Sequence, residues 1–137
     1  IHPDWTFIFP THPNPIIQNQ LEPLRDLSNV RLLTPLSHFE LVKILVKTQL
    51  VITDSGGIQE ETTYLGVQCI TLRKSTERPS TVDVGTNQLI GLDLEKAERA
   101  CLDVLSENKK IGVIPELWDG LAAERIVKIL VNEINLS

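Results

Sequence analysis

The sequence predicts an α/β protein with a Rossmann-like parallel sheet and helices on both faces of that sheet. Two observations predict this class. Short β-branched or aromatic runs alternate with segments of helix length, and most of these runs are nearly continuous in apolar residues. The chain has 137 residues and a mass of 15.4 kDa, which is enough for one core but not for two. We therefore expect residues 1–137 to form a single domain.

Five segments have the length and composition of strands. They are Thr6–Phe9, Val30–Leu33, Leu50–Thr53, Cys69–Leu72 and Leu89–Gly91. Because apolar runs of this kind are typical of strands buried on both faces, we expect helices to cover the sheet on each side.

Two helices in the first half of the chain are predicted from their capping residues. Asn14 precedes Pro15, which suits a first helical position, and Pro23 should kink or restart this helix. Ser37 and Glu40 fit a capping box that opens the second helix. The apolar face of the second helix would carry Leu41, Ile44, Leu45 and Thr48.

Three further helices are expected in the second half. A short helix should end at Gly66, and Asp93 should open a longer one that stops at Asn108 in a left-handed conformation. Asp119 and Gly120 should open the last helix. The buried stripe of the last helix would contain Ala122, Ile126, Leu130 and Ile134.

Charge and cysteine content restrict the partners and the compartment. The net charge of −5 leaves no basic stripe for a phosphate backbone, so we expect no nucleic-acid partner. No apolar run approaches the ~18–20 residues that cross a bilayer, so no membrane association is expected. Cys69 and Cys101 lie in apolar stretches without paired spacing, which suits reduced thiols and a cytoplasmic protein. The chain begins at Ile1 and lacks methionine, so we expect it to be a piece of a longer protein.

The segment richest in chemistry is Leu50–Glu61, in which a buried strand leads into a tight turn and then a helix. Ligands of open α/β sheets bind at the carboxyl ends of strands, where such turns lie. Backbone N–H groups and the helix dipole favour an anion there, and Gly56 and Gly57 allow close approach, while Ser55 adds a hydroxyl donor. The turn therefore suits a phosphate or diphosphate. An equally plain alternative is a strand-to-helix turn that Ser55 caps.

Two charged positions near this turn have both a binding and a structural interpretation. Glu61 could accept two hydroxyls, as from a ribose, or it could be a solvated first-turn glutamate that the helix dipole favours. The loop Arg73–Pro79 could close a guanidinium on the ligand, or its Glu77 could pair internally with Arg78 or Lys74. No metal site is expected, because the histidines are scattered and no carboxylate cluster offers a ligand set.

Several motifs in combination resemble the non-hydrolysing UDP-N-acetylglucosamine 2-epimerases. They are Thr53–Glu61, Leu65-Gly66, Leu72-Arg73, Thr76–Pro79, Gly85–Asn87, Leu89–Gly91, Pro10–Pro15, Pro35-Leu36 and Trp118–Ile126. The resemblance covers essentially the whole chain. It implies a UDP-binding Rossmann-like domain that forms the C-terminal half of a glycosyltransferase-B type fold, with the first strand of that domain missing.

The resemblance also implies roles for individual residues. Ser55, Gly56 and Gly57 would hold the diphosphate of UDP or of a UDP-N-acetylhexosamine, Glu61 the ribose hydroxyls, and Arg78 would supply positive charge at the phosphates. The loop that contains Leu36 and the position of Leu41 would lie near the uracil. The family has an aromatic residue at the position of Leu41, and Phe39 could take over its stacking on the base. His12 is similar to a histidine that some members connect with regulation by UDP-N-acetylglucosamine.

The implied reaction inverts carbon 2 of the sugar by elimination and re-addition of UDP, in nucleotide-sugar metabolism for cell-surface polysaccharide. The resemblance places the acid-base carboxylates and a binding or catalytic histidine outside this chain, so it implies no catalytic residue here, no cofactor and an inactive fragment. The intact enzyme would be a homodimer. Three alternatives stay open: a hydrolysing 2-epimerase, a UDP-sugar glycosyltransferase, and a non-catalytic nucleotide-binding module.

The missing first strand has a structural consequence. It would lie between Thr6–Phe9 and Leu50–Thr53, and an open gap would expose two unpaired edges. We therefore expect these two strands to pair directly and in parallel, or a second copy of the chain to cover the edges.

Overall fold

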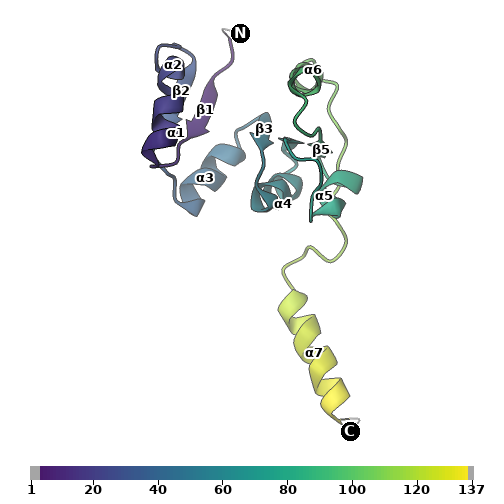
Figure 1. Ribbon diagram of the computed structural model, residues 1–137. Helices are drawn as coiled ribbons and strands as arrows, with labels where there is room; N and C mark the ends of the chain where they lie inside the picture. The colour runs from purple at the N-terminus through teal and green to yellow at the C-terminus, as the bar shows by residue number, and fades with distance from the viewer. Residues whose placement is uncertain (1–3, 136–137) are drawn as a thin grey trace. The chain divides into compact units, whose positions relative to one another are not determined.

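A computed structural model describes residues 4–135 of the chain (Figure 1). The chain divides into two compact units, Ile1–Ile44 and Leu45–Ser137, and each unit is treated by itself below. Among residues 4–135, no helix is both long enough and apolar enough to cross a bilayer.

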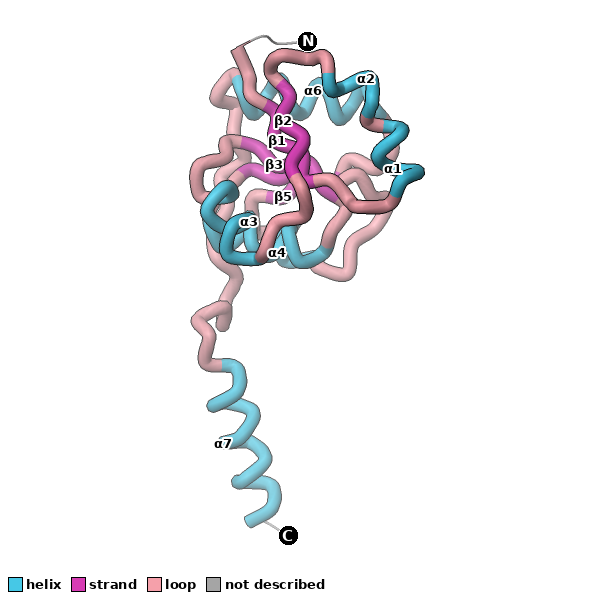
Figure 2. The backbone as a smooth tube through the Cα atoms, turned by 90° about the vertical axis from the view of Figure 1, so that its left-hand side faces the viewer, coloured by secondary structure: helices cyan, strands magenta, loops and turns pink. Residues whose placement is uncertain are grey.

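The first unit is built on two parallel strands. β1 (Phe7–Pro10) pairs with β2 (Val30–Leu33), with Phe7 opposite Val30, and the two strands run side by side in Figure 2. Between them lie α1 (Pro15–Gln20) and α2 (Glu22–Arg25). The Asn14 side chain caps α1 by accepting from the backbone N–H of Ile16 at 2.9 Å, and the chain restarts as α2 around Pro23, as predicted.

Helix α3 (His38–Leu45) begins with the predicted capping box. The backbone N–H of Ser37 donates to Glu40 Oε2 at 2.8 Å, and the backbone N–H of Glu40 donates to Ser37 Oγ at 3.4 Å. The Ser37 hydroxyl also donates to Glu40 Oε2, at 2.6 Å, and this bond, followed by the one from the Ser37 backbone N–H, lowers the pKa of the Glu40 carboxyl. Local capping chemistry therefore suffices to begin this helix where the sequence predicts.

The second unit is built on three parallel strands with helices on both faces. β4 (Gln68–Thr71) lies between β3 (Leu50–Thr53) and β5 (Asn87–Leu89). Helices α4 (Gly56–Leu65) and α6 (Leu94–Leu105) lie on opposite sides of this sheet in Figures 1 and 2. All four residues of β4 are buried, because β4 has a strand on each side and a helix over each face. The predicted class, a parallel α/β sheet covered by helices, is confirmed.

Most predicted element boundaries agree with the structure. Val30–Leu33 and Leu50–Thr53 are strands as predicted, and the first and fourth predicted strands shift by one residue. The fifth begins two residues early because Asn87, a polar residue, pairs in the sheet and bonds to Thr71. Helix α4 ends at Gly66 in a left-handed conformation, as predicted. Helix α6 begins after Asp93 as predicted, but Glu107 rather than Asn108 takes the left-handed conformation.

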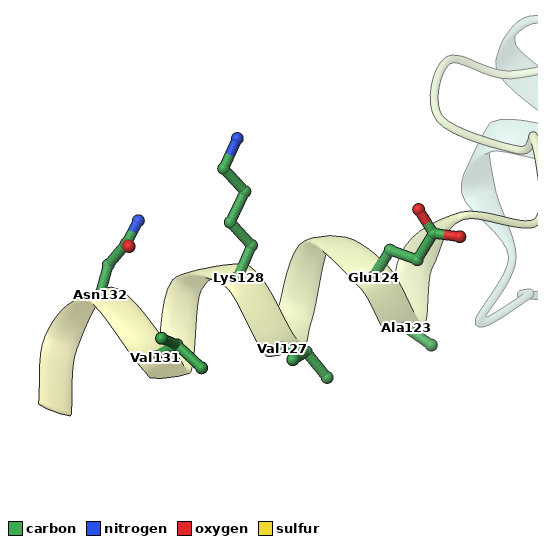
Figure 3. Close-up of a pocket in the computed structure, with 6 residues that line it drawn as sticks. All are labelled: Ala123, Glu124, Val127, Lys128, Val131 and Asn132. Carbon is green, nitrogen blue, oxygen red and sulfur yellow. The ribbon is translucent and has the colours of Figure 1, made fainter.

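Two predictions about burial are wrong. Residues of β1 are exposed on both faces, because β2, the element that packs closely on β1 within its unit, pairs with its edge and leaves both faces open. Helix α7 (Ala122–Asn135) begins near the predicted residue, but its predicted buried stripe is exposed. Figure 3 shows Val127 and Val131 on one side of α7, and Lys128 and Asn132 on the other. Apolar side chains thus line one side of α7, but no described residue covers them.

The predicted direct pairing of Thr6–Phe9 with Leu50–Thr53 is also wrong. In the described part of the chain, β1 pairs only with β2, and β3 pairs only with β4. Every strand pair in the described residues joins two strands that follow one another in sequence: β1 with β2, β3 with β4, and β4 with β5. The pairs that form therefore have the shortest separations along the chain.

Candidate functional site

The turn between β3 and α4 presents the backbone N–H groups of Gly56 and Gly57, whereas the N–H of Ser55 donates to Thr53 Oγ1 at 3.0 Å. Ser55 occupies the N-cap position with extended backbone (φ −83°, ψ 128°), but its side chain makes no capping hydrogen bond. No acidic residue lies in the first turn of α4 itself, and the Glu77 carboxylate, which reaches Gly56 from a later loop, is paired with Arg73. The structural alternative, in which Ser55 caps α4 with its hydroxyl, is therefore not what the chain adopts. The arrangement can accept an anion at this end of the helix.

The two glycines of the turn have different surroundings. A Cβ on Gly56 would lie 2.8 Å from Glu77 Oε1, the end of a flexible side chain that is 52% exposed, so Glu77 would have to shift to admit it. A Cβ on Gly57 would meet only Ser55 Oγ, at 4.0 Å. Gly57 also has no positive φ. Nothing within the described residues therefore requires glycine at position 57, whereas a ligand that approaches the main chain would.

The Arg78 guanidinium is held beside the first half of α4. Its Nε lies 2.9 Å from Glu60 Oε1, and both side chains are about two-fifths exposed. Its Nη1 makes only a long 3.5 Å bond to the Glu77 carbonyl. The terminal amino groups of Arg78 can therefore face an added anion while Nε stays on Glu60.

The internal pairing predicted for Glu77 is different in the structure. Arg73 Nη1 donates to both oxygens of Glu77, at 3.2 and 3.0 Å. Hydrogen bonding from the backbone N–H of Glu77, followed by that from Arg73, lowers the pKa of the Glu77 carboxyl. The ion-pair partner of Glu77 is therefore Arg73, four residues earlier, rather than Lys74 or Arg78. The Arg78 side chain lies against Glu60 of α4 instead.

A buried polar network lies beneath this site. Gln59 on α4 and Asn87 on β5 are both fully buried, and Asn87 Nδ2 donates to Gln59 Oε1 at 3.1 Å. Thr76 also donates to Gln59 Oε1, at 2.6 Å, and Thr71 donates to Asn87 Oδ1 at 2.7 Å. The network thus joins α4, the loop before α5 (Pro79–Asp83), β4 and β5.

Glu61 lies in the second turn of α4 and is half-buried. The alternative interpretation as a solvated glutamate in the first turn is therefore wrong. Helix α4 is ten residues long rather than very short, which places Glu61 beyond the first turn.

The remaining predicted site residues belong to the first unit. His12 is exposed, and its Nδ1 accepts from the backbone N–H of Asn14 at 3.2 Å. Leu36 and Leu41 are half-buried. Phe39 is exposed, with Lys43 Nζ 4.1 Å from its ring centroid.

Comparison with known proteins gives the family. A family model described as UDP-N-acetylglucosamine 2-epimerase matches residues 1–131. The chain belongs to this family.

Relatives in the family match nearly all of the chain. UDP-N-acetylglucosamine 2-epimerase of Methanocaldococcus jannaschii is 38% identical over 131 residues, which are 93% of this chain and 35% of that relative. A crystal structure of UDP-GlcNAc 2-epimerase from Neisseria meningitidis bound to UDP-GlcNAc is 30% identical with a TM-score of 0.84, covering 96% of this chain and 37% of that one. The M. jannaschii enzyme in complex with UDP-GlcNAc and UDP is 37% identical with a TM-score of 0.77, covering 93% and 36%. The chain thus spans little more than a third of the length of these proteins.

Sequence reasoning about this 2-epimerase chain missed three residues of the site. It assigned no role to Glu60, Gln59 or Asn87, although the first two lie within the Thr53–Glu61 motif and Asn87 within the Gly85–Asn87 motif. The available signal is the set of polar residues on one face of α4, since Gln59, Thr62 and Thr63 recur at helical spacing and are all buried. Among residues 4–135, no group of His, Cys, Asp and Glu side chains could hold a metal.

Proposed function

We propose that the intact protein interconverts UDP-N-acetylglucosamine and UDP-N-acetylmannosamine at carbon 2, and that residues 1–137 form its UDP-binding domain. The observation that carries this proposal is the donor-rich N-terminus of α4, with Arg78 beside it, in a chain of the 2-epimerase family. Solved relatives hold UDP-GlcNAc or UDP, which supports UDP as the ligand.

The proposed role of this chain is to stabilise the leaving group. Breaking the bond between the sugar carbon 1 and the phosphate oxygen puts negative charge on the β-phosphate of UDP. The N–H groups of Gly56 and Gly57, the hydroxyl of Ser55 and the terminal amino groups of Arg78 would meet that charge. Loss of one such preorganised donor typically costs ~10²–10³ in rate. The proton transfers at carbon 2 would be made by residues outside this chain.

The nucleoside would use the other predicted residues. We assign the ribose hydroxyls to Glu61 and the surroundings of the uracil to Leu36 and Leu41. The exposed ring of Phe39 has Lys43 Nζ over one face, which leaves its other face for stacking on the base. His12 is proposed to respond to UDP-N-acetylglucosamine rather than to take part in the reaction.

Turnover of UDP-N-acetylglucosamine tests the proposal. Proton NMR of the intact protein with this substrate should show UDP-N-acetylmannosamine accumulating to an equilibrium. Release of only free sugar and UDP would contradict epimerisation and indicate the hydrolysing reaction. Residues 1–137 alone should be inactive, and turnover by them would contradict the placement of the acid-base groups.

The cellular setting is also a proposal. Both cysteines are unpaired, and burial raises the pKa of each thiol, which suits a reducing compartment such as the cytoplasm. A role in supplying nucleotide sugars for cell-surface polysaccharide and a homodimeric intact enzyme stay predictions. Sedimentation of the intact protein tests the second.

A further inference from the structure

Arg78 is anchored at both ends of its own backbone by two threonine hydroxyls. Its backbone N–H donates to Thr76 Oγ1 at 3.1 Å, and its carbonyl oxygen accepts from Thr81 Oγ1 at 2.7 Å. The Arg78 backbone is otherwise irregular, with φ −121° and ψ 58°, and it precedes the proline that opens α5. These two hydroxyls therefore fix the position of the Arg78 backbone and, with it, of the Arg78 Cα from which the side chain extends.

Both hydroxyls depend on the same pair of buried amides. Thr76 Oγ1 donates to Gln59 Oε1 at 2.6 Å, and Thr81 Oγ1 accepts from Asn87 Nδ2 at 3.1 Å. Asn87 Nδ2 also donates to Gln59 Oε1, and Asn87 Oδ1 accepts from Thr71 on β4. Hence each backbone anchor of Arg78 leads within two hydrogen bonds to Gln59 on α4.

The chemistry at Gln59 indicates that its carbonyl oxygen is the group this position needs. Oε1 accepts from both Thr76 and Asn87, whereas no described residue accepts from Nε2, which is buried. A buried amide donor without a partner costs stability, so packing alone would favour an apolar side chain. Turning the amide around would place its NH₂ against the NH₂ of Asn87, which fixes the orientation of the acceptor.

We propose that Gln59 is a positioning residue for Arg78, acting through Thr76, Asn87 and Thr81. Gln59 sits on α4 three residues after Gly56, so the network fixes Arg78 relative to the donors at the start of that helix. The inference rests on the proposed function for the identity of the ligand, UDP. It assigns no contact between Gln59 and UDP.

Calorimetry with UDP tests the coupling in the intact protein. We expect Gln59→Met, which keeps the length of the side chain but removes the acceptor, to weaken UDP binding by about tenfold. Arg78→Ala should also weaken it. In the double variant, Gln59→Met should add little to the effect of Arg78→Ala, because it acts through the lost side chain. Independent, additive effects would overturn the inference.

Thr63→Val is the matched control. Thr63 is buried on the same helix, and its hydroxyl has no hydrogen-bond partner among the described residues. Removing this hydroxyl disturbs the buried face of α4 without touching the Gln59 network. UDP affinity should therefore stay at the wild-type value, and a loss equal to that of Gln59→Met would overturn the inference.

Amide hydrogen exchange without ligand separates this inference from the proposed function. The backbone N–H groups of Arg78 and Thr81, which donate to Thr76 Oγ1 and to the Arg78 carbonyl, should exchange faster in Gln59→Met and at the wild-type rate in Thr63→Val. Unchanged exchange in Gln59→Met would overturn the positioning role whatever the ligand. Faster exchange together with unchanged UDP affinity in Arg78→Ala would support the positioning role and contradict the proposed UDP site.

Discussion

At Gly57, the fold tolerates a side chain, whereas a bound diphosphate would not. Because a Cβ there meets only Ser55 Oγ, at 4.0 Å, Gly57→Ala should leave the free energy of unfolding unchanged or slightly raised. The same methyl would occupy the space through which a diphosphate approaches the N-terminus of α4. We therefore expect thermal unfolding to show no loss and calorimetry to show weaker UDP binding.

Gly66→Ala is the reciprocal control for that prediction. Gly66 has a φ of 70° and ends α4 in the left-handed conformation, which an alanine adopts only with strain. This variant should lose about 1 kcal/mol of stability but keep its UDP affinity. If Gly57→Ala instead lowered stability and left UDP binding intact, the glycine would serve the turn alone.

Arg78 and Glu61 carry the second residue-scale prediction. Arg78→Ala and Glu61→Ala should each weaken UDP binding, by about 1.5 kcal/mol, the lower end of the range for hydrogen bonds to charged groups. The lower end applies to Arg78 because its side chain is 41% exposed. Calorimetry of the intact protein measures both. Unchanged affinity in both variants would return these side chains to purely structural roles.

Local chemistry explains which site residues could be predicted. The Ser55–Gly57 turn follows from a strand, a tight turn and a helix in immediate succession, so the sequence suffices to place it. The partner of Arg78 does not follow, because Glu60 lies eighteen residues away and meets it only after β4 is inserted between α4 and the loop. Gln59 and Asn87 are polar residue types that usually lie at the surface, so their burial depends on mutual hydrogen bonds.

The helices show the same division between local and distant causes. Helix starts at Asn14, Ser37 and Asp93 were predictable, because each cap is made within three residues along the chain. The exposure of the apolar face of α7 was not predictable, because an apolar stripe indicates which face can be buried but not whether an element of the chain covers it.

The start of α7 should respond to acid. Asp119 accepts from the backbone N–H of Leu121 at 3.0 Å and binds Arg125 with both oxygens. The hydrogen bond from Arg125 is the largest cause that lowers the Asp119 pKa from 3.8 to about 2. Because the folded pKa is the lower one, this contribution is present above pH 3.8 and is lost as the pH falls through about 2.

NMR titration of the Leu121 amide measures that transition. Its chemical shift should follow the protonation of Asp119 with a midpoint at about 2. Asp119→Asn keeps an oxygen acceptor for Leu121 but has no charge to titrate, so its Leu121 amide should show no such transition. A midpoint near the ordinary value of 3.8 in the wild type would show that Arg125 does not hold Asp119 in solution.

At the scale of the whole molecule, much apolar surface is left uncovered. Phe7, Ile8 and Phe9 of β1 are each more than two-fifths exposed, and Ile126 and Leu130 of α7 are more than half exposed. Contiguous apolar surface of this kind marks an interaction site. Because the chain spans little more than a third of its relatives, the sequence of this part alone could predict these faces but not their partners.

Residues 1–137 in isolation should therefore associate through the apolar face of α7. Sedimentation velocity should show species heavier than the 15.4 kDa monomer that increase with concentration. Val131→Glu puts a charge on the apolar side of α7 and should shift the chain toward monomer. Asn132→Glu adds the same charge one residue later on the polar side (Figure 3) and should leave association unchanged. Equal effects of the two variants would mean that net charge, rather than burial of this face, governs association.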